Sequence, residues 1–279
     1  IISTIVYIFV GFLMFYIWPT FQDRIFKFGQ LIASSGYGGT FVYGIVKRAL
    51  VPFGLHHVFY MPFYQTAIGG TLEVNGVLID GAQNIFFAQL ADPNLKHFSV
   101  EATKYFSGEY MIMMFGLPGA ALAMYRSAKD ESKKVVRSLF LSAALTSMLT
   151  GITEPIEFAF IFVAPMLFVV DVFLAGTAFV LAQALRVTIG FTFSCGLIDF
   201  LVFGVLQGNS KTHWIFIVIF GLIYFFLYYF SFTYLIKKYN LKTPGREDNN
   251  KLTIFNKKKI DYSFDQSLLD PQVQMIIKG

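Results

Sequence analysis

A seven-residue segment with two acids, a glycine and a proline interrupts the apolar middle of this 279-residue chain. The segment reads Gly-Ile-Thr-Glu-Pro-Ile-Glu (151–157) and lies between apolar runs at 138–149 and 158–170. A carboxylate at bilayer depth is costly unless it finds a partner or a watery cavity. Gly151 and Pro155 break a helix, and broken backbone is tolerated at that depth only where it is buried in protein or lines a cavity. The segment therefore predicts a broken-helix binding site in a membrane protein.

The composition agrees with a membrane location. The sequence is 56% hydrophobic and only 14% charged, whereas soluble chains have about 25% charged residues. The net charge of +5 could indicate nucleic-acid binding, but basic residues gather at the ends of apolar runs, as at Lys237 and Lys238. This placement follows the positive-inside rule and argues against a nucleic-acid partner. The single cysteine, Cys195, excludes an internal disulfide and a CxxC metal site, and we expect no metal or cofactor.

Apolar runs and turn residues predict the course of the chain. We expect a membrane span at 1–19, an interfacial or tilted helix at 21–33, irregular backbone at 51–62, and an excursion outside the membrane core at 69–104. In that excursion, Asn75-Gly76 between two apolar stretches predicts a β-hairpin.

The second half of the chain predicts two further spans around the seven-residue segment. These are a helix at 105–128, bent near Pro118, and a last span at 213–236, while 129–137 is expected to be a basic cytoplasmic loop. A second interrupted region at 188–209 pairs with the first, and paired broken segments indicate a transporter's substrate site.

Each of the two acids in the 151–157 segment could have either a structural role or a substrate-binding role. Both could cap a helix N-terminus after Thr153, where a carboxylate is favoured. We expect this structural role for Glu157 and a substrate contact for Glu154.

Other candidates are a histidine pair and two charged residues. His56 and His57 lie in a Gly- and Pro-broken aromatic segment and could be interfacial or functional. Arg48 could instead reach lipid headgroups. Asp199 is expected to be a cap or an ion-pair partner.

Several sequence motifs, in a fixed order over residues 1–250, resemble the EIIC membrane component of the phosphoenolpyruvate-dependent sugar phosphotransferase system, glucose superfamily. The matching motifs are LVPFGLHH (50–57), MFGLP (114–118), LSAALTS (141–147), GITEPIE (151–157), GLIDF (196–200), GNSK (208–211) and KTPGRE (242–247). The motifs HHVFYMP (56–62) and GAQNIFFAQ (81–89) are most similar to those of maltose and α-glucoside members, with glucose members close behind.

The resemblance implies an all-α, multi-span membrane protein that is homodimeric in full length. Its membrane domain would cover 1–239, with a transport domain mainly at 40–239 that contains two re-entrant hairpins. It implies that Glu154 and His56 hold the sugar near its 6-hydroxyl, with Arg48 assisting and Glu154 as candidate base. His57, Thr153 and Asp199 are expected to support them.

Compared with full-length members of the family that it resembles, this chain is expected to lack the first helices and the IIB domain. The first helices of the family do not occur before Ile1, and 240–279 is expected to be a cytoplasmic linker to a IIB domain. The phosphocysteine loop of that domain does not occur in the chain, and Cys195 cannot replace it. This chain alone is expected to bind sugar without phosphorylating it.

The expected setting is a multi-pass protein of the bacterial inner membrane with a cytoplasmic C-terminus. Its expected partners are the lipid bilayer, phosphorylated IIB, IIA and the general phosphotransferase proteins, which together form a protein-phosphocysteine sugar phosphotransferase. The rival reading is a proton-coupled secondary sugar transporter that uses Glu154. A weaker alternative is a structural membrane subunit or a sensor that does not transport.

Overall fold

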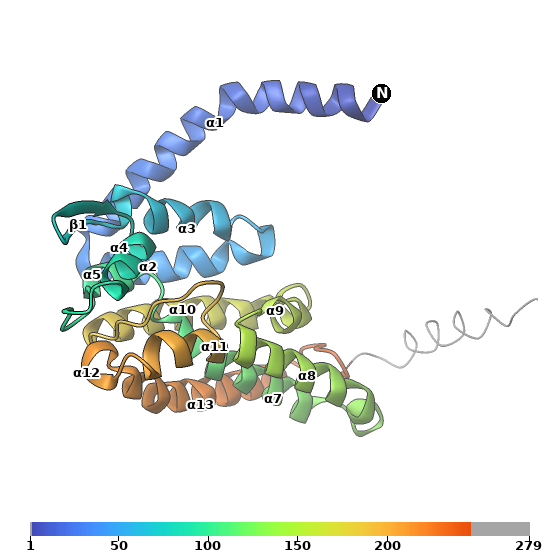
Figure 1. Cartoon of the computed structure of the whole chain (residues 1–279). Coiled ribbons are helices and arrows are strands. Elements are labelled where there is room, and N and C mark those ends of the chain that lie inside the picture. Colours follow the sequence, from blue (N-terminus) through green and yellow to red (C-terminus); the bar gives the residue numbers. More distant parts are fainter. Residues whose placement is uncertain (1, 247–279) are drawn as a thin grey trace, which may run out of the picture.

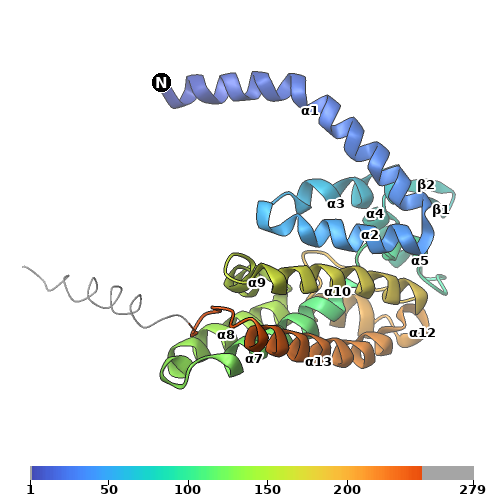
Figure 2. The same ribbon diagram turned by 180° about the vertical axis from the view of Figure 1, so that it is seen from behind.

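A computed structural model describes residues 2–246 as helices in two layers (Figures 1 and 2). Gly44 of one layer packs on Gly176 of the other, since a Cβ added to Gly44 would lie 3.0 Å from the Gly176 Cα. Small residues allow membrane helices to approach this closely. Within the described residues the only sheet is one two-stranded hairpin, and the prediction of an all-α membrane fold is confirmed.

The first layer holds the elements up to residue 103. They are α1 (Ile2–Ser34), α2 (Gly36–Ala49), η1 (Val51–Phe53), α3 (His56–Gln65), η2 (Ala67–Gly69), β1 (Thr71–Val74), β2 (Val77–Asp80), α4 (Ala82–Leu90) and α5 (Val100–Thr103).

The second layer holds the remaining helices. They are α6 (Glu109–Met111), the π-helical turn η3 (Ile112–Gly116), α7 (Leu117–Ser127), α8 (Asp130–Thr150), α9 (Glu154–Ile161), α10 (Pro165–Ala184), α11 (Leu197–Asp199), the π-helical turn η4 (Phe200–Val205), α12 (Asn209–Thr212) and α13 (Trp214–Lys238). A bend is predicted near Pro118, and the π-helical turn η3 ends two residues before that proline.

Three of the described helices are long and apolar enough to cross a membrane. They comprise residues Ser3–Ser34, Pro165–Ala184 and Trp214–Lys238. The first joins the predicted span and the predicted interfacial helix into one helix, with Pro19 inside it. The helix continues because 21–33 has helical spacing of apolar residues and contains no second proline.

The prediction of irregular backbone throughout 51–62 is wrong for its second half. Irregular backbone ends at Gly54, which is left-handed (φ 67°), and α3 then runs through Pro62. A proline inside a helix removes one hydrogen bond. Burial of Phe59, Phe63 and Tyr64 on one side of α3 offsets that loss.

The predicted hairpin and the predicted basic loop can both be compared with the structure. The hairpin at Asn75-Gly76 is confirmed, and both residues have the positive φ of a two-residue type I′ turn.

The predicted loop at 129–137 is wrong, because α8 begins at Asp130. Asp130 and Glu131 lie in the first turn, where negative charge favours a helix N-terminus.

Candidate functional site

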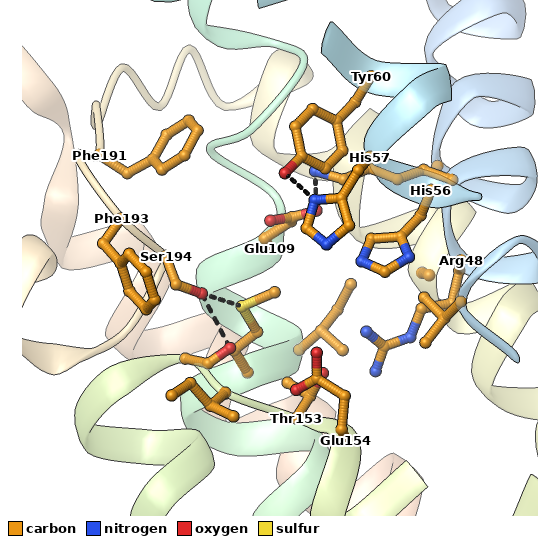
Figure 3. Close-up of a pocket in the computed structure, with 18 of the residues that line it drawn as sticks. Arg48, His56, His57, Tyr60, Glu109, Thr153, Glu154, Phe191, Phe193 and Ser194 are labelled. Carbon is orange, nitrogen blue, oxygen red and sulfur yellow. Dashed lines mark hydrogen bonds and ion pairs between the residues drawn. The ribbon is translucent and has the colours of Figure 1, made fainter. Parts of the chain in front are cut away.

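A cavity of about 350 Å³ lies where the two layers meet. Its walls come from α2, α3, α6, η3 and from two loops, one between α8 and α9 and one before α11. Figure 3 shows histidines of α3 on one side and the α8–α9 loop opposite them. Of the six predicted site residues, five line this cavity, namely Arg48, His56, His57, Thr153 and Glu154.

The α8–α9 loop brings Glu154 to the cavity. Helix α8 ends at Thr150, and Gly151 takes a left-handed conformation (φ 74°) that reverses the backbone. Glu154 is then the first residue of α9, and Pro155 follows it at a position where a missing N–H has no cost. The Glu154 side chain is half-buried and points into the cavity (Figure 3). Its carboxylate makes no hydrogen bond or ion pair with any described residue, so it can accept bonds from a ligand.

The two histidines have different partners. Their rings lie in contact, with centroids 4.0 Å apart and planes tilted by 37°. His57 Nδ1 lies 2.6 Å from the Tyr60 hydroxyl and shares a hydrogen bond with it. His56 Nδ1 is buried and has no hydrogen-bond partner among the described residues. His57 thus has one ring nitrogen engaged within the protein, whereas the described residues give His56 no hydrogen bond at Nδ1.

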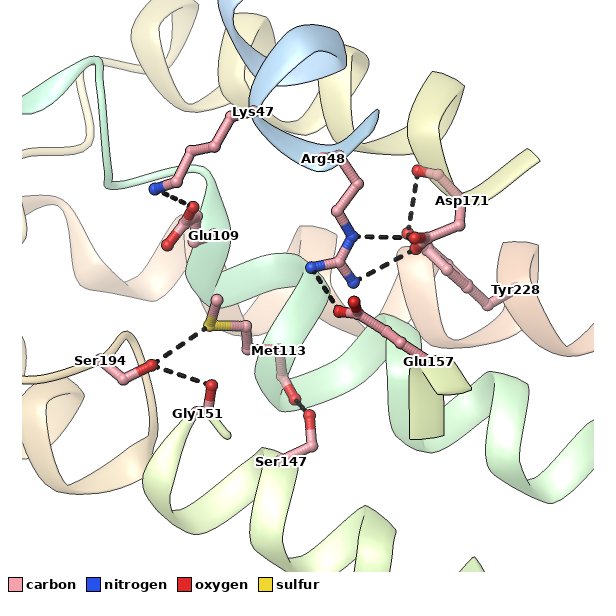
Figure 4. A network of polar contacts seen from close by, with 10 residues as sticks. All are labelled: Lys47, Arg48, Glu109, Met113, Ser147, Gly151, Glu157, Asp171, Ser194 and Tyr228. Atoms are coloured by element: carbon pink, nitrogen blue, oxygen red, sulfur yellow. Dashed lines mark hydrogen bonds and ion pairs between the residues drawn. The ribbon is translucent and has the colours of Figure 1, made fainter. Parts of the chain in front are cut away.

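Arg48 is held by two carboxylates, Asp171 beside its guanidinium and Glu157 below it in Figure 4. Its Nε donates to Asp171 Oδ2 at 2.8 Å, and its Nη1 lies 2.8 Å from Glu157 Oε1 in an ion pair without hydrogen-bond alignment. The Tyr228 hydroxyl donates to Asp171 Oδ1 at 2.8 Å. These contacts tie α2 to α9, α10 and α13. Both carboxylates are fully buried, so the cluster fixes the guanidinium beside the cavity.

The two acids of the 151–157 segment are thus separated in space. Glu154 faces the cavity, whereas Glu157 is fully buried and pairs with Arg48. A spacing of three residues puts the two side chains on neighbouring faces of the first turn of α9, so the packing of α2 and α10 around that turn separates their environments.

Asp199 lies behind the cavity wall instead of in it. Its carboxylate accepts hydrogen bonds from the backbone N–H groups of Thr192, Phe193 and Ser194 at 3.0, 3.3 and 3.3 Å, and from the Thr192 hydroxyl at 2.8 Å. It therefore fixes the loop before α11, and that loop supplies Thr192, Phe193 and Ser194 to the cavity.

The two broken segments touch each other. The Ser194 hydroxyl donates to the Gly151 carbonyl at 2.8 Å, as Figure 4 also shows. A Cβ on Gly196 would lie 2.6 Å from the Gly151 nitrogen, so only glycine permits this approach. The prediction from sequence that the two regions act together has this contact as its structural basis.

Sequence reasoning missed one charged pair in the cavity wall. Lys47 and Glu109 form a buried ion pair, and the Lys47 ammonium also donates to the Tyr64 hydroxyl at 2.7 Å. The available signal was the presence of ionisable residues in apolar segments, which by itself marks a functional candidate.

A helical membrane protein whose cavity forms where two broken segments meet belongs to the class of membrane transport domains. Known proteins agree with this class. The family described as "Phosphotransferase system, EIIC" matches residues 1–176. The chain belongs to this EIIC family.

Relatives of the chain carry names from the same system. It is 47% identical over 249 residues to the "PTS system glucoside-specific EIICBA component" of Staphylococcus carnosus (strain TM300), covering 89% of this chain and 35% of the relative. It is 47% identical over 240 residues to the "PTS system glucose-specific EIICBA component" of Staphylococcus saprophyticus, covering 86% of this chain and 34% of the relative. The chain thus spans about a third of the length of these relatives.

Proposed function

We propose that this chain is the sugar-translocating membrane part of a phosphotransferase system, and that it imports a glucose- or maltose-type sugar. The sugar would lie in the cavity with its 6-hydroxyl toward Glu154, and a phosphorylated IIB domain would phosphorylate that hydroxyl. The observation that carries the proposal is the meeting of Glu154, His56 and Arg48 at one cavity. Residues 247–279, the expected linker toward IIB, lie outside the described part of the chain.

Each of these residues has a proposed task. The Glu154 carboxylate accepts a hydrogen bond from the 6-hydroxyl and takes its proton as the oxygen attacks phosphorus, while the bond from phosphorus to the cysteine sulfur of the IIB partner breaks and the thiolate leaves. His56 bonds a neighbouring sugar oxygen, and Arg48 supplies positive charge beside the reacting group. Phosphoryl transfer depends mainly on positioning and charge stabilisation, which this arrangement supplies, while the phosphoryl group comes from the partner.

The test is glucose and maltose binding and phosphorylation by the full-length protein that contains this chain, as wild type and as Glu154→Gln. The variant keeps the shape of the side chain and removes its charge. We expect affinity to fall about tenfold to a hundredfold, because a hydrogen bond to a charged group is lost. We expect phosphorylation to fall by about a hundredfold or more, because general-base catalysis is lost.

Glu73→Gln is the matched control, because Glu73 is an exposed carboxylate on the β1–β2 hairpin. It should leave both activities unchanged. Binding and phosphorylation that are undiminished in Glu154→Gln would overturn the role of Glu154. Accumulation of free sugar driven by a proton gradient, with no sugar phosphate inside, would favour the proton-coupled transporter instead.

A further inference from the structure

We propose that Lys47 and Glu109 form a second polar binding point of the cavity, and that this pair recognises sugar hydroxyl groups remote from the phosphorylated one. This inference rests on the proposed function, since it assumes that the ligand is a sugar. Lys47 of α2 and Glu109 of α6 would then determine which sugar the protein binds.

The pair lies in the same cavity as Glu154 but among other neighbours. Lys47 and Glu109 both line the cavity, and Figure 3 shows Glu109 below Tyr60, on the side away from Arg48. The Lys47 and Glu109 side chains are 9% and 11% exposed, whereas the carboxylates that hold Arg48 are fully buried. The Glu109 carboxylate is therefore open to a ligand in the cavity, whereas the carboxylates of Asp171 and Glu157 are not.

The pair also keeps unused hydrogen-bonding capacity. An ammonium has three donors and an ionised carboxylate has about four acceptor positions. Lys47 uses donors on Glu109 and on Tyr64, and the Cys195 thiol also lies within hydrogen-bonding reach of the Glu109 carboxylate. One donor and several acceptor positions remain, and a sugar hydroxyl needs both kinds of partner. Arg48 keeps only donors, since a guanidinium has no acceptor, and three of its N–H groups already face Asp171 and Glu157.

Stability alone does not explain the pair. A buried ion pair can be replaced by apolar residues with little loss or even a gain in stability, because its desolvation is costly. Ionisable residues inside membrane proteins line substrate paths by default. The Tyr60 ring lies 4.6 Å from the Lys47 ammonium and also lines the cavity. A flat aromatic face beside a charged pair suits a sugar ring, which has both apolar C–H faces and hydroxyl edges.

The test compares glucose with analogues that each lack one hydroxyl, at C2, C3 or C4, in the full-length protein as wild type and as Glu109→Gln. In wild type we expect at least one analogue to bind about tenfold or more weakly than glucose, since a hydrogen bond to a charged group is lost. In Glu109→Gln that penalty should shrink by about tenfold, because the partner of the missing hydroxyl is already weakened.

If Glu109→Gln folds poorly, Glu109→Asp allows the same comparison, because it keeps the carboxylate and shortens the side chain by one methylene. Penalties that stay the same in every variant, while glucose still binds, would show that the pair is structural and would overturn the inference. Glu154→Gln serves as the second reference, because its penalties for these three analogues should match those of wild type. Failure of the wild type itself to bind glucose or maltose would instead count against the proposed function.

Discussion

At the scale of residues, a buried cluster of charges around Arg48 borders the cavity. Arg48 faces two buried carboxylates, Asp171 and Glu157, so the cluster holds one cation and two acids. Removing Arg48 would leave two acids without a counter-charge. Removing the Tyr228 hydroxyl would leave Asp171 with its two guanidinium bonds.

The buried cluster predicts an order of stability among variants. Arg48→Met should lower the free energy of unfolding by about 3 to 5 kcal/mol, the usual cost of leaving buried charge uncompensated. Tyr228→Phe should cost about 1 to 3 kcal/mol, because one hydrogen bond to a carboxylate is lost. Thermal unfolding in detergent measures both. A Tyr228→Phe protein that is less stable than Arg48→Met would contradict this account of the cluster.

At the scale of elements, the site depends on two broken segments that press against each other. Gly151 ends α8, and Gly196 precedes α11, with their backbones in contact. Asp199 then fixes the loop that carries Phe193 and Ser194. Neither segment forms the cavity wall alone.

Gly196→Ala should therefore weaken sugar binding and lower thermal stability, because the added methyl would lie 2.6 Å from the Gly151 nitrogen and the Thr150 carbonyl carbon. Gly38→Ala is the matched control, since nothing lies within 4 Å of its added methyl. Within α2 that change should be neutral or stabilising by up to about 1 kcal/mol. Equal effects of the two substitutions on sugar binding would argue against the contact between the segments.

A further element-scale prediction concerns the loop that Asp199 holds. Asp199→Ala removes the acceptor of three backbone N–H groups and one hydroxyl. We expect sugar affinity to fall about tenfold or more, because Phe193 and Ser194 lose their fixed position. Equilibrium binding of labelled glucose to the full-length protein measures the effect, and Asp80→Ala on the exposed end of β2 serves as the control.

For the whole molecule, the two ends of the helices differ in charge and contacts. The start of α8 and the chain after α13 lie together, since the Lys129 N–H donates to the Gly245 carbonyl at 2.9 Å. The β1–β2 hairpin lies at the opposite end (Figures 1 and 2). The end that holds the start of α8 carries Lys129, Lys133 and Lys134. The positive-inside rule predicts that this end faces the cytoplasm.

Membrane sidedness can be read by cysteine labelling. Lys134→Cys should react with an impermeant thiol reagent only from the cytoplasmic side, and Glu73→Cys only from the outer side. Background is low because the sequence contains one cysteine, and Cys195 is fully buried. Labelling of both positions from the same side would contradict this orientation.

Much of the fold was predictable from sequence because strong local signals dictate it. Apolar length indicates the spans, Asn75-Gly76 indicates the hairpin, and Gly151 with Pro155 marks the broken helix. The errors at 51–62 and 129–137 have different causes. Tertiary packing of aromatic side chains and charges in a first helical turn outweighed the local breakers and the charge run.

The sequence by itself determined that the chain is a helical membrane protein with costly carboxylates at a broken helix. The sequence also predicted a structural role for Glu157 and a substrate contact for Glu154, but only the tertiary structure showed that Arg48 is the partner of Glu157 and that Glu154 faces a cavity. It also revealed the pairing of Lys47 with Glu109, residues far apart in the chain. The reason is physical. Apolar periodicity and helix breakers act between near neighbours, whereas the partner of a buried charge is determined by whichever distant element packs beside it.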